Sequence, residues 1–268
     1  MTNETHISEQ LEHYHHHWPT TKGKVTVGER AVLHGRDILY DLRKMDWLSL
    51  HFFSITSFEP DPKKLEAMMH IWAGCSYPDP RIWNNRIAAL AGSARSTAGL
   101  AFGAASAVSE ATIYGNRANI KCLDTLLRAH DAVKNGTDLK DFILSEIKLG
   151  RKIFGYGRPV RNKDERIPAM MEHLRELELL DDPYIQIALQ MEQILGDLKG
   201  LCMNSSGISA GIAASLGLTP RQYHVFLSPV FGIGFSPCYM EATEKPETCL
   251  FPVKCTEVKY TGPQHSDW

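Results

Sequence analysis

The sequence lacks an apolar run approaching the ~18 residues that a membrane-spanning helix needs. The longest candidate, Ala98 to Val108, is rich in Gly, Ala and Ser rather than in large apolar residues. A basic excess is also missing, because 29 Lys and Arg stand against 31 Asp and Glu, for a net charge of −2. That balance argues against a general nucleic-acid binder. We therefore expect neither a membrane nor a nucleic acid as partner.

The six cysteines form no CxxC pair, and the chain is too long to depend on a disulfide framework. Free thiols are the simplest interpretation, while the short spacing of Cys249 and Cys255 leaves a disulfide between them open. The N-terminus lacks the charged-then-apolar pattern of a secretion signal. We expect a cytoplasmic protein whose cysteines are reduced.

Clusters of acidic or His and Cys residues with metal-ligand spacing are absent as well, so we expect no metal. The histidine-rich segment His13 to His17 is polar, and consecutive imidazoles point in different directions. Solvated side chains explain this segment better than a metal site does. We expect residues 1–22 to form a flexible tail and residues 23–268 to form one folded domain.

What the sequence does contain is mainly helical periodicity. Lys24 to Gly35 predicts two short β segments around a glycine turn. Thr219 followed by proline is typical of a helix start, and the segment Gly232 to Pro237 should interrupt that helix. Residues 252–260 alternate enough to be extended. We therefore expect an all-α fold with minor β segments near both termini. Further helices are predicted at about 63–73, 118–133, 138–149, 165–179 and 183–195, with Asp138 and Asp182 as N-caps.

One predicted helix, Asn84 to Ala111, carries unusually many Gly, Ala and Ser residues at its apolar positions. Each glycine costs about 1 kcal/mol of helix propensity relative to alanine. Small residues make sense where helix backbones approach closely, as in a tight helical pack or a helix-on-helix subunit interface. An ordinary buried helix is an equal alternative.

The strongest local signal is the loop from Gly155 to Arg166. Gly155 and Gly157 allow the backbone to approach a ligand closely, and exposed amides there can meet a phosphate or a purine edge. Basic side chains beside the glycines provide a seat for an anionic ligand. A solvated surface loop explains these cations equally well, but it explains the paired glycines less well. The cations are Arg158, Arg161, Lys163 and Arg166.

This loop resembles the citrate synthase motif Gly-Tyr/Phe-Gly-His-x-Val followed by Asp-Pro-Arg. The chain is identified as a short, divergent member of the citrate synthase and citryl-CoA lyase superfamily, nearer in length to stand-alone citryl-CoA lyases. The resemblance implies a two-lobed helical fold with its small lobe at about 150–220, a homodimer or higher even oligomer with shared active sites, and a coenzyme A thioester as substrate. Four further segments resemble the family in the same order: Lys22 to Leu42, Asn84 to Ala118, Asn204 to Leu218 and Val253 to Gly262.

The resemblance also shows that the family's two catalytic histidines and one aspartate are replaced. The histidine positions fall on Tyr114 and Arg158, and the aspartate position falls near Ser206, with Ser205 or Met203 as alternatives. A tyrosine can donate a hydrogen bond to an enolate oxygen, but an arginine cannot shuttle a proton and a serine is no base unless activated. Substitute carboxylates are open, although a cap or surface role is the commoner one: Glu110, Asp164 and Asp79.

The carboxylate-binding arginines of the family are largely lost. Arg166 keeps one of them, Phe231 stands at the next, and the third falls near Cys255. We therefore expect substrate contacts from Asn204, Arg166 and Phe231, and an acceptor that is less charged than oxaloacetate. The coenzyme A contacts implied by the resemblance are Gly155, Tyr156, Gly157, Arg161 and Lys163.

Three functions remain open. The first is a lyase or acyltransferase that makes or breaks a carbon–carbon bond in an acyl-CoA, with a small carboxylate or carbonyl compound as acceptor. The second is a catalytically degenerate relative that binds coenzyme A or an acyl-CoA, or serves as a partner subunit. The third is another reaction on the same scaffold, such as thioester hydrolysis or a decarboxylation, for which Ser206 or Cys255 could serve.

Overall fold

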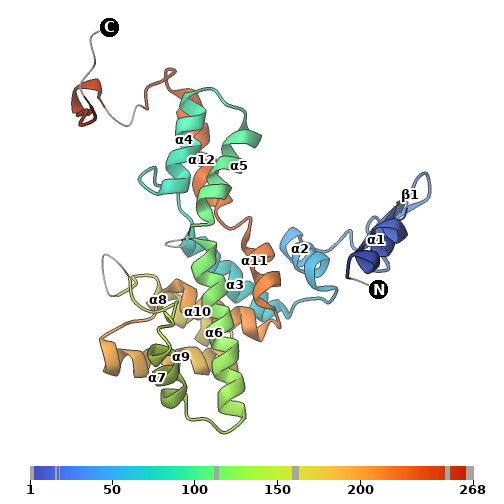
Figure 1. Ribbon diagram of the computed structural model, residues 1–268, viewed down its shortest axis with the longest axis vertical. Helices are drawn as coiled ribbons and strands as arrows, with labels where there is room; N and C mark the ends of the chain where they lie inside the picture. Colours follow the sequence, from blue (N-terminus) through green and yellow to red (C-terminus); the bar gives the residue numbers. More distant parts are fainter. Residues whose placement is uncertain are drawn as a thin grey trace. The chain divides into compact units, whose positions relative to one another are not determined.

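The computed structural model describes residues 3–15, 17, 19–111, 115–158, 163–250 and 254–263 (Figure 1). The chain divides into two compact units, Met1–Pro60 (unit 1) and Asp61–Trp268 (unit 2). The mostly helical fold is confirmed, since helices dominate the described residues. No described helix is both long and apolar enough to cross a lipid bilayer. The expected small lobe at about 150–220 stays a prediction.

Unit 1 combines a small antiparallel sheet with two helices. Its elements are α1 (Asn3–Tyr14), β1 (Gly23–Thr26), β2 (Arg30–Leu33), β3 (Arg36–Asp37) and α2 (Trp47–Thr56). The predicted turn joins β1 to β2, and Gly28 in it has φ +80°, which glycine adopts without strain. The two β segments are thus confirmed. The helix α1 lies within the predicted tail, whose flexibility stays a prediction.

Unit 2 is a set of packed helices. They are α3 (Pro62–Cys75), α4 (Trp83–Ser93), α5 (Ala98–Ser109), α6 (Asn116–Lys134), α7 (Leu139–Lys148), α8 (Ile167–Glu176), α9 (Pro183–Lys199), α10 (Ser205–Ser215), α11 (Pro220–Leu227) and α12 (Gly232–Glu244). A 3-10 helix, η1 (Cys255–Glu257), lies where the sequence predicts an extended segment. A hydrogen bond from the Glu257 N–H to the Lys254 carbonyl oxygen (2.9 Å) closes this turn. The prediction of an extended segment is therefore wrong at η1.

Three predicted helix starts are confirmed by their capping side chains. Asp138 and Asp182 accept hydrogen bonds from backbone N–H groups in the first turns of α7 and α9. Thr219 and Gln222 form a reciprocal capping box at the start of α11. Such caps satisfy N–H groups that the first turn of a helix leaves without intrahelical partners.

The segment predicted as one helix over Asn84 to Ala111 is two helices, α4 and α5. The chain turns at Arg95, whose φ of 58° is left-handed. The Arg95 guanidinium donates to carbonyl oxygens at the end of α12, at Thr243 (2.9 Å) and Lys245 (2.7 Å). These bonds satisfy carbonyls that the end of a helix leaves free. They join residues 148 and 150 positions apart, so periodicity could not reveal the break.

A second correction concerns α12, because Gly232, Gly234 and Pro237 lie inside this helix rather than interrupting one. The chain breaks earlier, between α11 and α12. A Cβ on Gly234 would lie 2.7 Å from Ser76 Oγ and 2.9 Å from Asn85 Oδ1, so the helix passes very close to the end of α3. Close tertiary packing thus overrides the low helix propensity of glycine.

The core of unit 2 is built around α10, against which α3, α6 and α9 pack (Figure 1). Every residue from Gly207 to Ala214 is buried. The helices α4, α5 and α12 pack together, with Phe102 and Phe231 set against buried Phe235. The first turn of α10 consequently has a fixed position, and most of the predicted site residues lie near it.

Candidate active site

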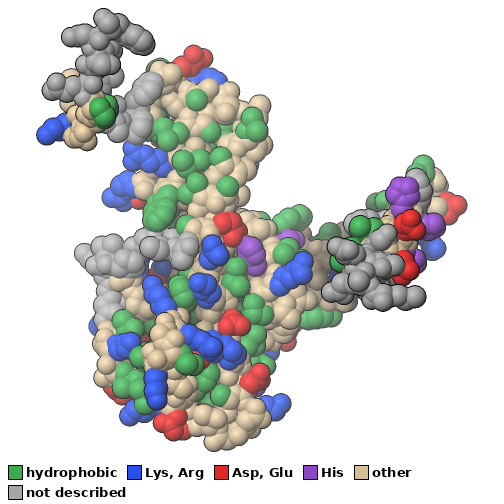
Figure 2. Space-filling model, viewed as in Figure 1, with side chains coloured by type: hydrophobic (Ala, Val, Ile, Leu, Met, Phe, Trp, Pro, Cys, Tyr) green, Lys and Arg blue, Asp and Glu red, His purple; other side chains and the backbone are tan. Residues whose placement is uncertain are grey.

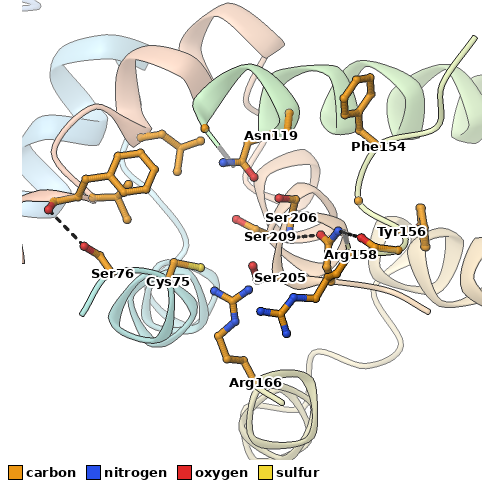
Figure 3. Close-up of a pocket in the computed structure, with 18 of the residues that line it drawn as sticks. Cys75, Ser76, Asn119, Phe154, Tyr156, Arg158, Arg166, Ser205, Ser206 and Ser209 are labelled. Carbon is orange, nitrogen blue, oxygen red and sulfur yellow. Dashed lines mark hydrogen bonds between the residues drawn. The ribbon is translucent and has the colours of Figure 1, made fainter. Parts of the chain in front are cut away.

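A pocket of about 940 Å³ lies within unit 2, bordered by the first turn of α10, the segment 151–158, the end of α3 and the connection from α11 to α12. Figure 3 shows Arg158 and Arg166 close to Ser205 and Ser206. A concave site of this size is typical for a small-molecule ligand. Eight predicted site residues line it: Gly155, Tyr156, Gly157, Arg158, Arg166, Asn204, Ser206 and Phe231.

One predicted residue lies elsewhere, and two are outside the described residues. Lys163 is exposed and does not line the pocket, and its backbone carbonyl accepts a hydrogen bond from Arg158 Nη1 (3.3 Å). Tyr114 and Arg161 lie outside the described residues. The catalytic role of Tyr114 and the coenzyme A contact of Arg161 therefore stay predictions.

The first glycine of the predicted ligand loop brings that loop against α10. Gly155 has φ +92°, a value at which other residues are strained. A Cβ on Gly155 would overlap Cys122 Sγ and lie 3.0 Å from Gly207 Cα. The Gly155 carbonyl accepts a hydrogen bond from the Asn204 N–H (2.9 Å). Contact with the protein itself accounts for this glycine, whether or not a ligand also approaches it.

Tyr156 anchors the same loop. Its hydroxyl donates to the Ala188 carbonyl in α9 (2.9 Å), and the residue is 7 % exposed. Burial raises the pKa of Tyr156 well above its usual value. The phenol therefore stays neutral, with its proton committed to the backbone.

The most elaborate contact of the pocket joins Asp164, Arg166 and α10. Arg166 donates through Nε (2.8 Å) and Nη2 (2.7 Å) to the two oxygens of Asp164. The Ser205 N–H in the first turn of α10 donates to the same carboxylate (3.1 Å). Burial alone would raise the pKa of Asp164, but the hydrogen bonds and charge of Arg166 outweigh it and lower that pKa. Asp164 is an ionised group that positions Arg166, and this pairing disfavours the alternative role as a general base, which stays untested.

Arg158 is held in a similar way by the carboxylate next in sequence. Its Nη1 donates to Glu165 Oε2 (2.5 Å) and lies 3.8 Å from Asp164 Oδ1. Each guanidinium has five N–H donors, so pairing with one carboxylate leaves donors for a ligand. The positive charges of Arg158 and Arg166 are nevertheless matched by two carboxylates of the loop.

Hydroxyl groups and a thiol complete the centre of the pocket. Asn204 caps α10 by accepting from the Ser206 N–H (2.9 Å), and its side-chain amide donates to the Gly157 carbonyl (2.8 Å). Among the described residues, the Ser206 hydroxyl has no hydrogen-bond partner in this structure. Cys75 also lines the pocket as a free thiol. Burial raises the pKa of the Cys75 thiol although Arg166 acts in the opposite direction, which disfavours a thiolate nucleophile.

A free general base is missing among the described lining residues, which include one carboxylate, Asp79, and no histidine. Arg81 donates to Asp79 through Nη2 (2.6 Å) and lowers the pKa of Asp79 to about 2. The other predicted alternative, Glu110, does not line the pocket and pairs with His224 (2.9 Å). A carboxylate already bound to a cation, as Asp79 is to Arg81, is a weak proton acceptor.

Metal ligands are likewise not assembled among the described residues, which hold no group of three or more His, Cys, Asp or Glu side chains suited to a metal ion. Within the segment His13 to His17, the structure describes all residues except His16.

Sequence patterns do not mark every lining residue, and Cys75 and Ser76 at the end of α3 are among those they miss. Ser205, an alternative to Ser206 at the family's aspartate position, begins α10 and also lines the pocket. Cys75 and Ser76 reach the pocket only because α3 packs against α10, and no local motif marks them.

Comparison with known proteins gives no match by sequence but clear matches by structure. No protein-family model and no curated protein matches the chain. Citryl-CoA lyase from Hydrogenobacter thermophilus superposes with a TM-score of 0.78 at 17 % identity, covering 94 % of this chain and 97 % of that one.

Two further structures extend the comparison. ATP citrate lyase from Methanothrix soehngenii, solved in complex with citrate and coenzyme A, gives a TM-score of 0.73 at 17 % identity, over 96 % of this chain and 44 % of that one. Citrate synthase from Thermoplasma acidophilum gives 0.58 at 15 % identity, over 84 % and 59 %. The chain has the fold of the citrate synthase and citryl-CoA lyase superfamily.

Proposed function

We propose that this chain binds an acyl-CoA in the pocket and makes or cleaves a carbon–carbon bond next to the thioester carbonyl. The observation that carries the proposal is the meeting of Arg158, Arg166 and Ser206 in one pocket of a citryl-CoA lyase-like fold. The solved relatives include a lyase in complex with (3S)-citryl-CoA, which supports a coenzyme A thioester as ligand.

The chemistry asks for a group that stabilises the enolate formed next to the thioester. Guanidinium and hydroxyl donors can provide this stabilisation in a pocket that excludes water. In this proposal Arg158 and Ser206 face the reacting carbonyl groups, and Arg166, fixed by Asp164, orients a carboxylate. Tyr114 is the predicted hydrogen-bond donor to the enolate oxygen, and it lies outside the described residues.

The second candidate function is binding of an acyl-CoA without turnover. It is favoured by one observation, namely that Asp79, the carboxylate among the described lining residues, is paired with Arg81. Loss of a general base typically costs about 10² to 10⁴-fold in rate. A chain of this kind would hold a thioester for a partner instead of converting it.

Calorimetric titration of coenzyme A, acetyl-CoA and citryl-CoA tests the shared part of both candidates. We expect binding that weakens at least about tenfold in Arg158→Ala, because a charge-assisted contact is lost. Arg175→Ala, at an exposed position on α8, is the matched control and should bind as the unaltered protein does. Absence of binding by all three ligands at millimolar concentration would refute the proposal.

Hydrogen exchange separates the two candidates. An enzyme that forms the enolate should exchange the methyl protons of acetyl-CoA for deuterium in D₂O, and mass spectrometry of the recovered thioester detects the exchange. Binding without exchange, together with intact citryl-CoA, would favour the second candidate.

We also propose that the chain forms a homodimer through α5. This helix is uncharged, and it exposes Gly99, Leu100, Gly103 and Ala104, with Leu100 70 % exposed. Figure 2 shows hydrophobic side chains spread over the surface of α4, α5 and α12. An apolar face of this kind is typical of an interaction surface. The small residues suit close contact with the same helix of a second copy.

A further inference from the structure

The two ends of the pocket differ in charge. Figure 3 shows Phe154 and Ser76 on opposite sides of the central Ser206. Lys152 and Lys121 place their Nζ atoms 5.2 and 5.1 Å from the Phe154 ring centroid, so the Phe154 end is cationic. An anionic portion of a ligand is favoured at that end.

The centre of the pocket carries two guanidinium groups but little net charge. Arg166 is neutralised by Asp164, and Arg158 is neutralised by Glu165. A ligand with two carboxylates would bring two further negative charges to this centre. A ligand with one carboxylate can use the remaining N–H donors of both arginines at a much smaller electrostatic cost.

The Ser76 end has an apolar wall. Leu227, Val230 and Phe231 line the pocket there, and the first two are 2 % and 5 % exposed. Polar lining groups near this wall are paired within the chain: the Ser76 hydroxyl donates to the Phe231 carbonyl (3.2 Å) and accepts from the Gly234 N–H (3.0 Å), and Asp79 is paired with Arg81. Burying an apolar group against the three apolar side chains is favourable.

We propose that the acceptor is a 2-oxo acid with a single carboxylate and an apolar side chain. This assignment rests on the function proposed above. The carboxylate of the acid would bind Arg166, its keto oxygen would face Arg158, and its side chain would pack against Leu227, Val230 and Phe231. A bond forms between the α-carbon of the acyl-CoA and the keto carbon of the acid. The α-proton is lost to a base, and the former keto oxygen takes up a proton as a hydroxyl. Cleavage is the reverse, and neither direction needs an oxidant or a reductant.

A series of acids tests this assignment in the unaltered protein. Coenzyme A binding is measured first by calorimetry, and then pyruvate, 2-oxobutanoate, 3-methyl-2-oxobutanoate, 4-methyl-2-oxopentanoate and oxaloacetate are titrated into the protein saturated with coenzyme A. We expect the affinity to rise about fourfold for each added methylene buried in the pocket. Oxaloacetate should bind more weakly than every acid with an apolar side chain.

The outcomes separate the acceptor class from the wider function. If coenzyme A binds but oxaloacetate is the tightest acid, or the series is flat, or no acid binds, the acceptor class is wrong and the proposed function stands. If no coenzyme A species binds, the proposed function fails, and the acid series measured without it decides whether the pocket still selects apolar monocarboxylates.

A substitution at the apolar end should reverse the preference. Phe231→Arg would give the wall a cation, and we expect oxaloacetate to gain at least about tenfold over 4-methyl-2-oxopentanoate, as for a new charge-assisted contact. Phe231→Leu keeps the wall apolar and should keep the original order. Because Phe231 packs against Phe235, thermal melting checks that both variants are folded, and the series in unaltered protein tests the proposal if either variant is not.

Discussion

The helices α10 and α5 have nearly the same composition and opposite surroundings. Both are uncharged and rich in Gly, Ala and Ser. In α10 every residue from Gly207 to Ala214 is buried, whereas α5 buries Ala101, Ala105 and Ser109 and leaves Leu100 exposed. Small residues thus predict that a helix can be approached closely, but they do not say which surface approaches it.

The glycines make the difference explicit. A Cβ on Gly207 would lie 2.8 Å from the Gly155 carbonyl oxygen, so the loop of the pocket presses directly on α10. A Cβ on Gly99 or Gly103 of α5 would meet no atom within 4 Å. The close approach that requires glycine lies inside the chain for α10, whereas no described residue approaches the glycines of α5 in this way.

The starts of the two helices differ as well. The first turn of α10 is held by Asn204 and by the buried carboxylate of Asp164. The first turn of α5 follows Thr97, which forms no side-chain cap. The helix that positions the pocket is fixed at its N-terminus by charge, while α5 is held by packing and, near its C-terminus, by a neutral hydrogen bond from Asn84 Nδ2 to Ser109 Oγ (3.0 Å).

The largest expected effect comes from Asp164→Asn, which removes the charge that fixes α10. The variant leaves Arg166 without its carboxylate partner, and breaking such a buried pair should lower the free energy of unfolding by about 4 kcal/mol. Urea denaturation measures the loss. Glu178→Gln breaks the exposed ion pair with Lys63 and should leave stability nearly unchanged. A small effect at Asp164 would mean that α10, like α5, does not depend on a charged anchor.

The next effect separates the glycines of the two helices. Gly207→Ala should lower the free energy of unfolding by about 3 kcal/mol, because overpacking forces the loop at Gly155 to move. Gly103→Ala should raise it by about 1 kcal/mol in monomeric protein, because alanine is the better helix former. Equal losses at both positions would show that the surroundings of α10 and α5 do not differ as the structure indicates.

Much of the fold could be predicted from the sequence because it depends on neighbours in the chain. The caps at Asp138, Asp182 and Thr219 act within one helical turn, so their residue types are sufficient to locate helix starts. The break at Arg95 could not be predicted in this way, because its guanidinium bonds to the distant end of α12.

The candidate site likewise has a part that the sequence marks and a part that depends on contacts between distant segments. The paired glycines and the basic residues of the 155–166 loop stand out in the sequence. Those that the structure describes line the pocket, except Lys163. The sequence leaves Asp164 open as a base, whereas the structure pairs it with Arg166, a contact that depends on burial that no local pattern reveals. The contribution of Cys75 depends on the packing of α3 against α10.

A third prediction tests whether a second chain covers α5. Leu100→Glu would place like charges opposite each other in the proposed dimer, which should raise its dissociation constant by about 100-fold or more. Light scattering during gel filtration measures the mass over a range of concentrations. Leu144→Glu, an exposed position on α7, is the matched control and should stay dimeric. A monomer in unaltered protein at every concentration would exclude the interface.

The smallest expected effect is a pH dependence confined to the anchoring of α10. The pKa of Asp164 is lower in the folded chain than in the unfolded one, so its stabilising contribution is complete above the unfolded value of about 3.9. That contribution is lost as the pH falls through the lower folded value, because protonation removes the partner of Arg166. Urea denaturation between pH 7 and pH 3 should therefore show the unaltered protein losing stability more steeply at the acidic end than Asp164→Asn. Parallel curves would mean that Asp164 has the same pKa in both states and that its charge does not anchor α10.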